Sequence, residues 1–224
     1  MNFIRAQQDY DNPSSLASRF RRARMKHVES LILAAFAEHG RCRIVDLGGR
    51  PDYWSMLDRG VLDACKVHVT TVNREPQTSI DDPLFDQQVG DACDVDAPDN
   101  AFDIAHSNSV IEHVGDWAQM ELFAAETRRL APRYYVQTPY FWFPIEPHLS
   151  AAFVHWAPEA WRARWLIRRG HGFFARIDGL SAAMRAVQDA RLLDKTMMRH
   201  LFPDARLEDE KVAGLTKSLM AIRS

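Results

Sequence analysis

Short apolar runs rich in β-branched residues alternate with helical stretches, and this alternation most constrains the fold. The runs are RIVDLGG, KVHVTTVN, a less regular segment around Phe85 to Val89, AFDIAHSN (101–108) and RYYVQTP (133–139). Strands that alternate with helices form βαβ units, whose sheet is mainly parallel and covered on both faces. Ligands of such sheets bind beyond the carboxyl ends of the strands. The pattern predicts an α/β protein with its functional residues at the strand ends.

The helical stretches and the end of the chain complete this prediction. Apolar residues recur at three- and four-residue steps from Leu16 to Phe36, which predicts an amphipathic helix ending near Gly40. A second helix is predicted between Asp116 and Leu130, with a buried face drawn from Trp117, Met120, Leu122, Phe123 and Leu130. A helix at about 181–193 and a hairpin of two strands, near 205–211 and 216–223, close the chain.

Composition narrows the class of protein. The 224 residues are 46 % hydrophobic and 26 % charged, which fits a single domain over 1–224. The net charge of −2 argues against a general polyanion binder, and the basic clusters at 19–26 and 162–169 are interpreted as solvated helix faces. The three cysteines include no CxxC pair, so neither a disulfide framework nor a structural zinc site is expected. Without a signal peptide or an apolar run of membrane-spanning length, a cytoplasmic location is expected.

The segments after the strands form an ordered set of motifs. They are VDLGG, then VGDACDVDAPDNAFDIAHSNSVIEHV, then VQTP. In this order and spacing they resemble the motifs of class I S-adenosylmethionine-dependent methyltransferases, especially the group that acts on small molecules. The resemblance covers about residues 40–140. It implies a Rossmann-like, seven-stranded mixed sheet of order 3-2-1-4-5-7-6, with the last strand antiparallel and helices on both faces.

The same resemblance implies S-adenosylmethionine as the cofactor and assigns residues to it. Asp46, Gly48 and Gly49 would line the methionine portion, and Asn73 occupies the ribose position. Asp91 would meet the adenine amino group beside the backbone of Ala92, and two residues after the fourth strand would lie beside the sulfonium. The full predicted set is Asp46, Gly48, Gly49, Arg50, Asn73, Arg74, Asp91, Ala92, Cys93, Ser107 and Asn108.

Two departures from the family pattern affect this site. The loop from Gly48 to Asp52 keeps only the first of three alternating glycines, and the acid that usually holds the ribose is replaced by Asn73. Asn73 donates and accepts hydrogen bonds without a charge, and Glu75, two residues further on, is a candidate to substitute for the acid. These two departures leave open either a weaker affinity for the cofactor or a scaffold that has lost its activity. A nicotinamide site is disfavoured because G-x-G-x-x-G is absent.

The segment QTPYFWFPIEPH (137–148) starts with the last three residues of the fifth strand and continues beyond it, where the family builds its substrate cavity. Methyl transfer needs an aligned nucleophile, and a hydroxyl nucleophile gains from a base such as histidine. His148 is the first choice for this base, with Glu146 and His113 as further catalytic residues. The predicted substrate contacts are Tyr140, Trp142 and His155.

Alternatives stay open around this segment. His113 also suits a structural role, and Glu112 with His113 alone does not define a metal site, so no metal is predicted. Residues 1–40 are expected to form an N-terminal helical segment and 140–180 an aromatic-rich lid or insertion, with about half of the aromatics as core.

The expected function is methyl transfer from S-adenosylmethionine to a small molecule, with oxygen favoured as the acceptor atom. An RNA methyltransferase is one alternative, because the stretch from Trp161 to Arg169 interleaves aromatic and basic residues. A catalytically inactive subunit that docks a partner is another. For partners, the expectation is a small-molecule substrate, no membrane span, no nucleic acid, and a homodimer as an open option.

Overall fold

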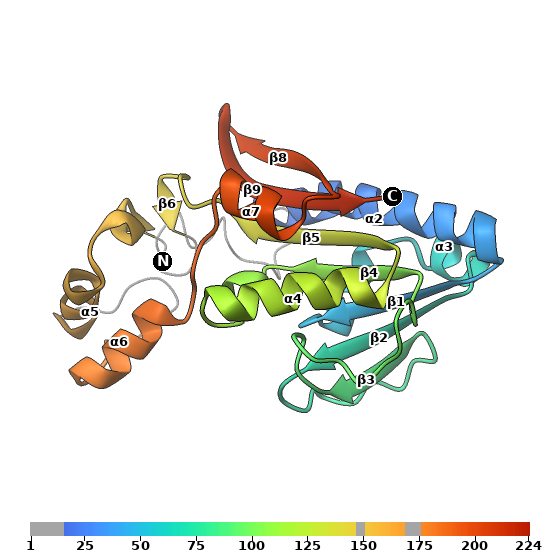
Figure 1. The fold of residues 1–224 in the computed structure, drawn as a ribbon, viewed down its shortest axis with the longest axis horizontal. Helices are drawn as coiled ribbons and strands as arrows, with labels where there is room; N and C mark the ends of the chain where they lie inside the picture. Colours follow the sequence, from blue (N-terminus) through green and yellow to red (C-terminus); the bar gives the residue numbers. More distant parts are fainter. Residues whose placement is uncertain (1–15, 147–150, 169–175) are drawn as a thin grey trace.

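A central sheet organises the chain in the computed structural model, which describes residues 16–146, 151–168 and 176–224 (Figure 1). The strands of the sheet are β1 (Cys42–Leu47), β2 (Val67–Asn73), β3 (Phe85–Val89), β4 (Ile104–Asn108), β5 (Arg133–Pro139), β8 (Arg206–Val212) and β9 (Leu215–Arg223). Their order is β3-β2-β1-β4-β5-β9-β8. β1 to β5 run parallel, whereas β9 is antiparallel to β5 and to β8. The predicted order and the antiparallel last strand are confirmed.

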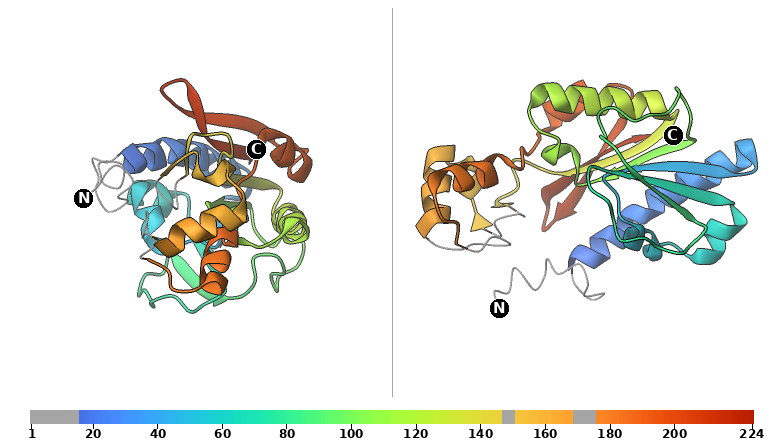
Figure 2. Two further views of the ribbon diagram at one scale, coloured as in Figure 1. Left: turned by 90° about the vertical axis from the view of Figure 1, so that its left-hand side faces the viewer. Right: turned by 90° about the horizontal axis from the view of Figure 1, so that it is seen from below.

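Helices cover both faces of this sheet (Figures 1 and 2). On one side lie α2 (Leu16–His39), the 3-10 helix η1 (Pro51–Met56) and α3 (Arg59–Ala64); on the other lie α4 (Trp117–Leu130) and α7 (Lys195–Leu201). Strand residues alternate between the two cores, so that Ile44 packs with α2 and Val45 with α4. A short 3-10 helix, η2 (Ile111–His113), follows β4, and Asp116 caps α4 by accepting a hydrogen bond from Gln119 N.

A lid follows β5 and lies beyond one end of the sheet (Figure 1). Its elements are β6 (Ile145–Glu146), β7 (Ala151–Ala152), the 3-10 helix η3 (Val154–Trp156), α5 (Glu159–Arg168) and α6 (Leu180–Gln188). A separate small core holds it together, formed by Val154, Ala163, Leu166, Ala183 and Val187. The predicted insertion after the fifth strand is confirmed. No described helix is long and apolar enough to span a membrane.

Several local predictions were wrong because tertiary packing overrides the local pattern. The helix predicted for about 181–193 ends at Gln188, since Leu193 leaves it to enter the main core, where it is fully buried. Leu122 is exposed, because the buried face of α4 runs through Met120 and Phe123. Arg24 is buried rather than solvated.

Exposure in the lid is mixed. About half of its aromatic residues were expected to be core; of those that the structure describes, Trp142, Phe153, Trp156 and Trp161 are exposed, whereas Tyr140, Phe141, Phe143 and Trp165 are half-buried. The helices α3 and α7 were missed because six or seven residues are too few to show a helical period.

Candidate cofactor and acceptor sites

The turn after β1 has a steric reason for both of its glycines. Gly48 has a φ of +70°, and its N–H donates to Val72 O at 2.8 Å. A Cβ on Gly48 would lie 2.7 Å from both Cγ atoms of Val110, and a Cβ on Gly49 would lie 1.8 Å from Asp46 Oδ2. The backbone therefore packs closely here with two adjacent glycines in place of the family's alternating three. Arg50 next to it is exposed and pairs with Asp52 at 3.3 Å.

Asp46 lies beneath this turn and is bonded to the protein. The residue is fully buried; Oδ2 accepts from Trp54 Nε1 at 2.8 Å, and Oδ1 lies 2.6 Å from His106 Nδ1. A carboxylate without exposed surface is not available to line a ligand directly. Asp46 would act on a cofactor through the turn above it.

Asn73, at the end of β2, reaches back to the same turn. Its Nδ2 donates to Gly49 O at 2.9 Å. None of the hydrogen bonds among the described residues goes to its Oδ1, which can accept from a hydroxyl. The side chain is half-buried at the carboxyl edge of the sheet. This arrangement fits the predicted ribose position.

Asp91 is held in the loop after β3. Its Oδ1 accepts from Cys93 N at 2.9 Å, and its Oδ2 accepts from Arg74 Nη2 at 3.1 Å. These contacts, the backbone hydrogen bond first, lower the pKa of Asp91, so its carboxylate stays an acceptor. Burial raises the pKa of the Cys93 thiol to about 12, so that Cys93 is not a nucleophile at neutral pH. Ala92 is half-buried in the same loop.

The two residues predicted beside the sulfonium differ in their surroundings. Ser107 is fully buried, and its hydroxyl donates to Leu47 O at 3.1 Å, so it joins β4 to β1. Asn108 Oδ1 accepts from Arg24 Nη1 at 2.7 Å and from Tyr53 Oη at 3.2 Å. Only Asn108, which is half-buried, is placed to meet a ligand.

Arg24 is one residue of this region that sequence reasoning missed. It is 5 % exposed, donates to Gln137 Oε1 at 2.7 Å, and pairs with Glu210 at 2.9 Å. It thereby joins α2 to the ends of β4 and β5. Its partner Glu210 stands at the other end of the chain, and a local pattern carries no signal of such a pair.

These residues together fit S-adenosylmethionine. A tightly packed glycine turn, an acceptor at Asn73 Oδ1 and an ionised Asp91 lie at the carboxyl ends of β1, β2 and β3. This edge is where parallel sheets bind such ligands. Each of these groups is partly exposed.

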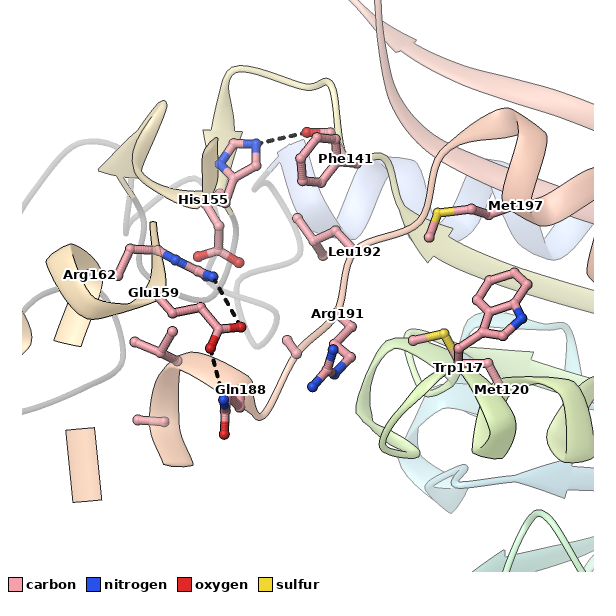
Figure 3. A pocket seen from close by; sticks show the side chains of 14 residues that line it. Trp117, Met120, Phe141, His155, Glu159, Arg162, Gln188, Arg191, Leu192 and Met197 are labelled. Carbon is pink, nitrogen blue, oxygen red and sulfur yellow. Dashed lines mark hydrogen bonds and ion pairs between the residues drawn. The ribbon is translucent and has the colours of Figure 1, made fainter. Parts of the chain in front are cut away.

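A cavity of about 280 Å³ lies between the lid and the sheet (Figure 3). Its walls come from α4, the segment after β5, the lid and the connection from α6 to α7. They comprise Trp117, Met120, Phe141, Glu146, His155, Glu159, Arg162, Ala186, Val187, Gln188, Ala190, Arg191, Leu192 and Met197. Because Phe141 follows β5, and Arg191 N donates to Glu112 O in η2, the cavity lies beyond the carboxyl ends of β4 and β5.

His155 is the histidine among the described residues that line this cavity. It is 7 % exposed, and its Nε2 lies 2.8 Å from Phe141 O (Figure 3). A carbonyl oxygen only accepts, so Nε2 carries the hydrogen and donates. Burial lowers the pKa of His155. Its Nδ1, which has no hydrogen-bond partner among the described residues, then holds the lone pair of a neutral imidazole.

Carboxylates and guanidinium groups share the remaining polar wall. Glu146 is 5 % exposed. Glu159 Oε2 accepts from Gln188 Nε2 at 2.8 Å, and its Oε1 lies 4.0 Å from Arg162 Nη2 (Figure 3). Burial lowers the pKa of Arg162 from its ordinary value. The cavity therefore offers both donors and acceptors in a largely apolar enclosure, as small-molecule sites do.

The structure brings together only part of the predicted catalytic and substrate set. Glu146 and His155 line the cavity. Tyr140 and Trp142 do not; Tyr140 lies against Lys195, and Trp142 is 55 % exposed. His113 also lies off the cavity wall, with Nδ1 3.3 Å from Asp189 Oδ2.

The first-choice base, His148, lies outside the described residues. Sequence reasoning missed the charged residues Glu159, Arg162 and Arg191 as cavity residues. Charged residues such as these are also typical of a solvated helix face. Only the packing of the lid shows that the three side chains line the same cavity.

One family model matches part of the chain. Residues 58–133 match the family described as a methyltransferase domain, a span from the N-cap of α3 to the start of β5. This match and the strand order agree with the predicted resemblance to class I methyltransferases. S-adenosylmethionine is the cofactor that this resemblance implies. No curated protein matches the sequence.

Two solved structures are similar to this chain at low identity. One is the 1,6-didemethyltoxoflavin-N1-methyltransferase of Burkholderia thailandensis with bound 1,6-didemethyltoxoflavin and S-adenosylhomocysteine: 14 % identity, TM-score 0.48, covering 88 % of this chain and 78 % of that chain. The other is a protein described as a methyltransferase, in complex with the Trm112 methyltransferase activator of Haloferax volcanii: 15 % identity, TM-score 0.48, covering 99 % and 97 %. Neither similarity identifies the acceptor of this chain.

Proposed function

We propose that the protein methylates a small-molecule acceptor bound in the lid cavity. The observation that carries the proposal is the position of this cavity, beyond the ends of β4 and β5 and walled by Glu146 and His155. At about 280 Å³ it suits a small molecule or part of one. S-adenosylmethionine, when bound, supplies a methyl group on a sulfonium that is already a good leaving group.

We propose oxygen as the methylated atom, with a histidine as the base. A neutral imidazole is the form that accepts a proton, and burial keeps His155 in that form near neutral pH. The hydrogen bond from Nε2 to Phe141 O fixes the ring. Its Nδ1 is buried in this structure, so it would take the hydroxyl proton of the acceptor after a small shift of the cavity wall brings the two atoms into contact. His148, the base predicted from the sequence, stays a proposal beside it.

The test measures S-adenosylhomocysteine formed from S-adenosylmethionine with two fractions of a cell extract, one of small molecules and one of RNA. We expect product with the small-molecule fraction alone. His155→Gln should lower turnover at least about 100-fold, the usual contribution of a general base, and should leave the affinity for S-adenosylhomocysteine within about twofold. A parallel loss of turnover and cofactor affinity would rule out this role for His155.

One observation favours RNA as a second candidate acceptor. On α5, the rings of Trp161 and Trp165 stack with centroids 6.2 Å apart and planes at 14°, and Arg164 and Arg168 are exposed three residues beyond each of them. Stacked aromatic rings beside arginine suit single-stranded nucleic acid. Product formed with the RNA fraction, together with binding of RNA that weakens steeply with salt, would replace the small-molecule proposal.

A further inference from the structure

Three residues from separate elements meet beneath the turn after β1, and we name Asp46, Trp54 and His106 the Asp46 cluster. Asp46 is 0 % exposed, and Trp54 and His106 are each 1 % exposed. The carboxylate accepts from Trp54 Nε1 at 2.8 Å and from His106 Nδ1 at 2.6 Å. A buried carboxylate is costly unless such bonds are made. The cluster therefore has one favoured arrangement, and each partner depends on the others.

Both ends of the loop from Gly48 to Trp54 contact Asp46. At the start, the Gly49 backbone packs so close that a Cβ would overlap the Asp46 carboxylate, and Gly49 N donates to the main-chain carbonyl oxygen of Asp46 at 3.3 Å. At the end, Trp54 in η1 donates its indole N–H to the same carboxylate. A hydrogen bond from Asn73 to Gly49 O links the loop to the ribose position. The position of Asp46 therefore sets the shape of the whole loop.

His106 in turn fixes Asp46. It lies on β4 directly opposite Asp46 in the parallel register. Its ring stacks on Tyr135 at 5.6 Å with planes at 8°, and the rings of Tyr53 and Trp54 lie 5.3 and 5.2 Å away. The enclosure leaves the ring little rotational freedom. Because a carboxylate only accepts, Nδ1 carries the hydrogen that joins β4 to the loop.

We propose that His106 is a positioning residue for cofactor binding, which holds the loop from Gly48 to Trp54 through Asp46. In this proposal, the hydrogen bonds from His106 in β4 and from Trp54 in η1 to Asp46 shape the loop. They take the place of the two further glycines of the family pattern, which this loop lacks. The inference rests on the proposed cofactor site, since the loop must contact the cofactor for its shape to matter. His106 itself, being buried, touches no ligand.

The experiment separates the hydrogen bond of His106 from the packing of its ring. His106→Asn keeps an amide N–H near the position of Nδ1 but loses the ring. His106→Phe keeps a ring and loses the donor. We expect His106→Asn to bind S-adenosylhomocysteine within about threefold of the native protein, and His106→Phe to bind at least about tenfold more weakly, the effect of one hydrogen bond to a charged group. The reverse order would show that His106 acts only as packing and would overturn the inference.

Two more variants secure the result. Trp54→Phe removes the other donor to Asp46 and should weaken binding by a similar factor, which covers the case in which His106→Phe does not fold. Tyr135→Phe is the control, because Tyr135 Oη has no hydrogen-bond partner among the described residues and the ring stays in place. An effect of Tyr135→Phe equal to that of His106→Phe would contradict the proposal.

Amide hydrogen exchange of the ligand-free protein distinguishes failure of this inference from failure of the proposed function. Exchange in residues 48–54 should be faster in His106→Phe than in His106→Asn or the native protein. If the native protein binds no S-adenosylhomocysteine but shows this pattern, the proposed function fails and the positioning of the loop stands. If it binds and the exchange of the variants is equal, the positioning inference fails alone.

Discussion

The carboxyl edge of the sheet around Asp46, here called the cofactor edge, and the lid differ in how deeply their side chains are buried and bonded. At the cofactor edge, Asp46, Trp54 and His106 are at most 1 % exposed and bonded to one another between large cores. In the lid, the separate core has five buried residues, and its exposed aromatic side chains are 41–56 % exposed. A cofactor common to many reactions calls for a fixed site. If the lid binds the acceptor as proposed, its separate core allows that wall to change without loss of the fold.

The largest effect should come from Arg24→Met at the cofactor edge. The change removes the ion pair to Glu210 and the hydrogen bonds to Asn108 and Gln137. Since removing one partner of a buried pair leaves an uncompensated charge, the free energy of unfolding should fall by about 3 kcal/mol or more. Urea denaturation measures it. Lys26→Met, at an exposed position of the same helix, should stay within about 0.5 kcal/mol, and equal losses would refute the contrast.

An intermediate and local effect is expected from Leu166→Ala in the lid. Leu166 is fully buried in the lid core, and such truncations cost about 2–5 kcal/mol where the affected unit unfolds. Because this core is separate from the two cores of the sheet, amide exchange should rise in α5 and α6 and stay unchanged in β1 and β4. Faster exchange throughout the protein would show that the lid and the sheet form one cooperative unit.

The smallest effect should come from the protonation of His155. Burial holds its folded-state pKa below the ordinary 6.5, so the unfolded chain binds the proton first as the pH falls. The contribution of neutral His155 to the free energy of unfolding is therefore complete above pH 6.5. It is lost as the pH falls from that value toward the folded-state pKa. Between about pH 7.5 and about pH 5.5, the native Tm should drop by more than that of His155→Gln. Equal drops in Tm would mean that His155 titrates normally.

The sequence predicted the parts of the molecule that short-range patterns encode. Alternating β-branched runs and helical periods were enough for the sheet, and the motifs after the strands led to its order. The glycine turn was recognisable because Gly48 and Gly49 directly follow a buried strand.

What the sequence did not reveal depends on pairing across long separations. Arg24 looked like part of a solvated basic face, because nothing near it shows that Glu210 meets it. His106 was passed over as an ordinary strand residue, although strand register alone would place it beside Asp46. The cavity residues Arg162 and Arg191 converge only after α5 and α6 pack together, which no local period describes.

Calorimetric titration with S-adenosylhomocysteine tests the central claim, that the turn after β1 belongs to a working cofactor site. The account predicts saturable binding of one ligand per chain. Asn73→Ala should weaken that binding about tenfold through loss of the contact to Gly49 and of the Oδ1 acceptor. An absence of binding at roughly millimolar ligand, a dissociation range worth only about 4 kcal/mol, would contradict the account and favour a methyltransferase fold that serves as a binding subunit.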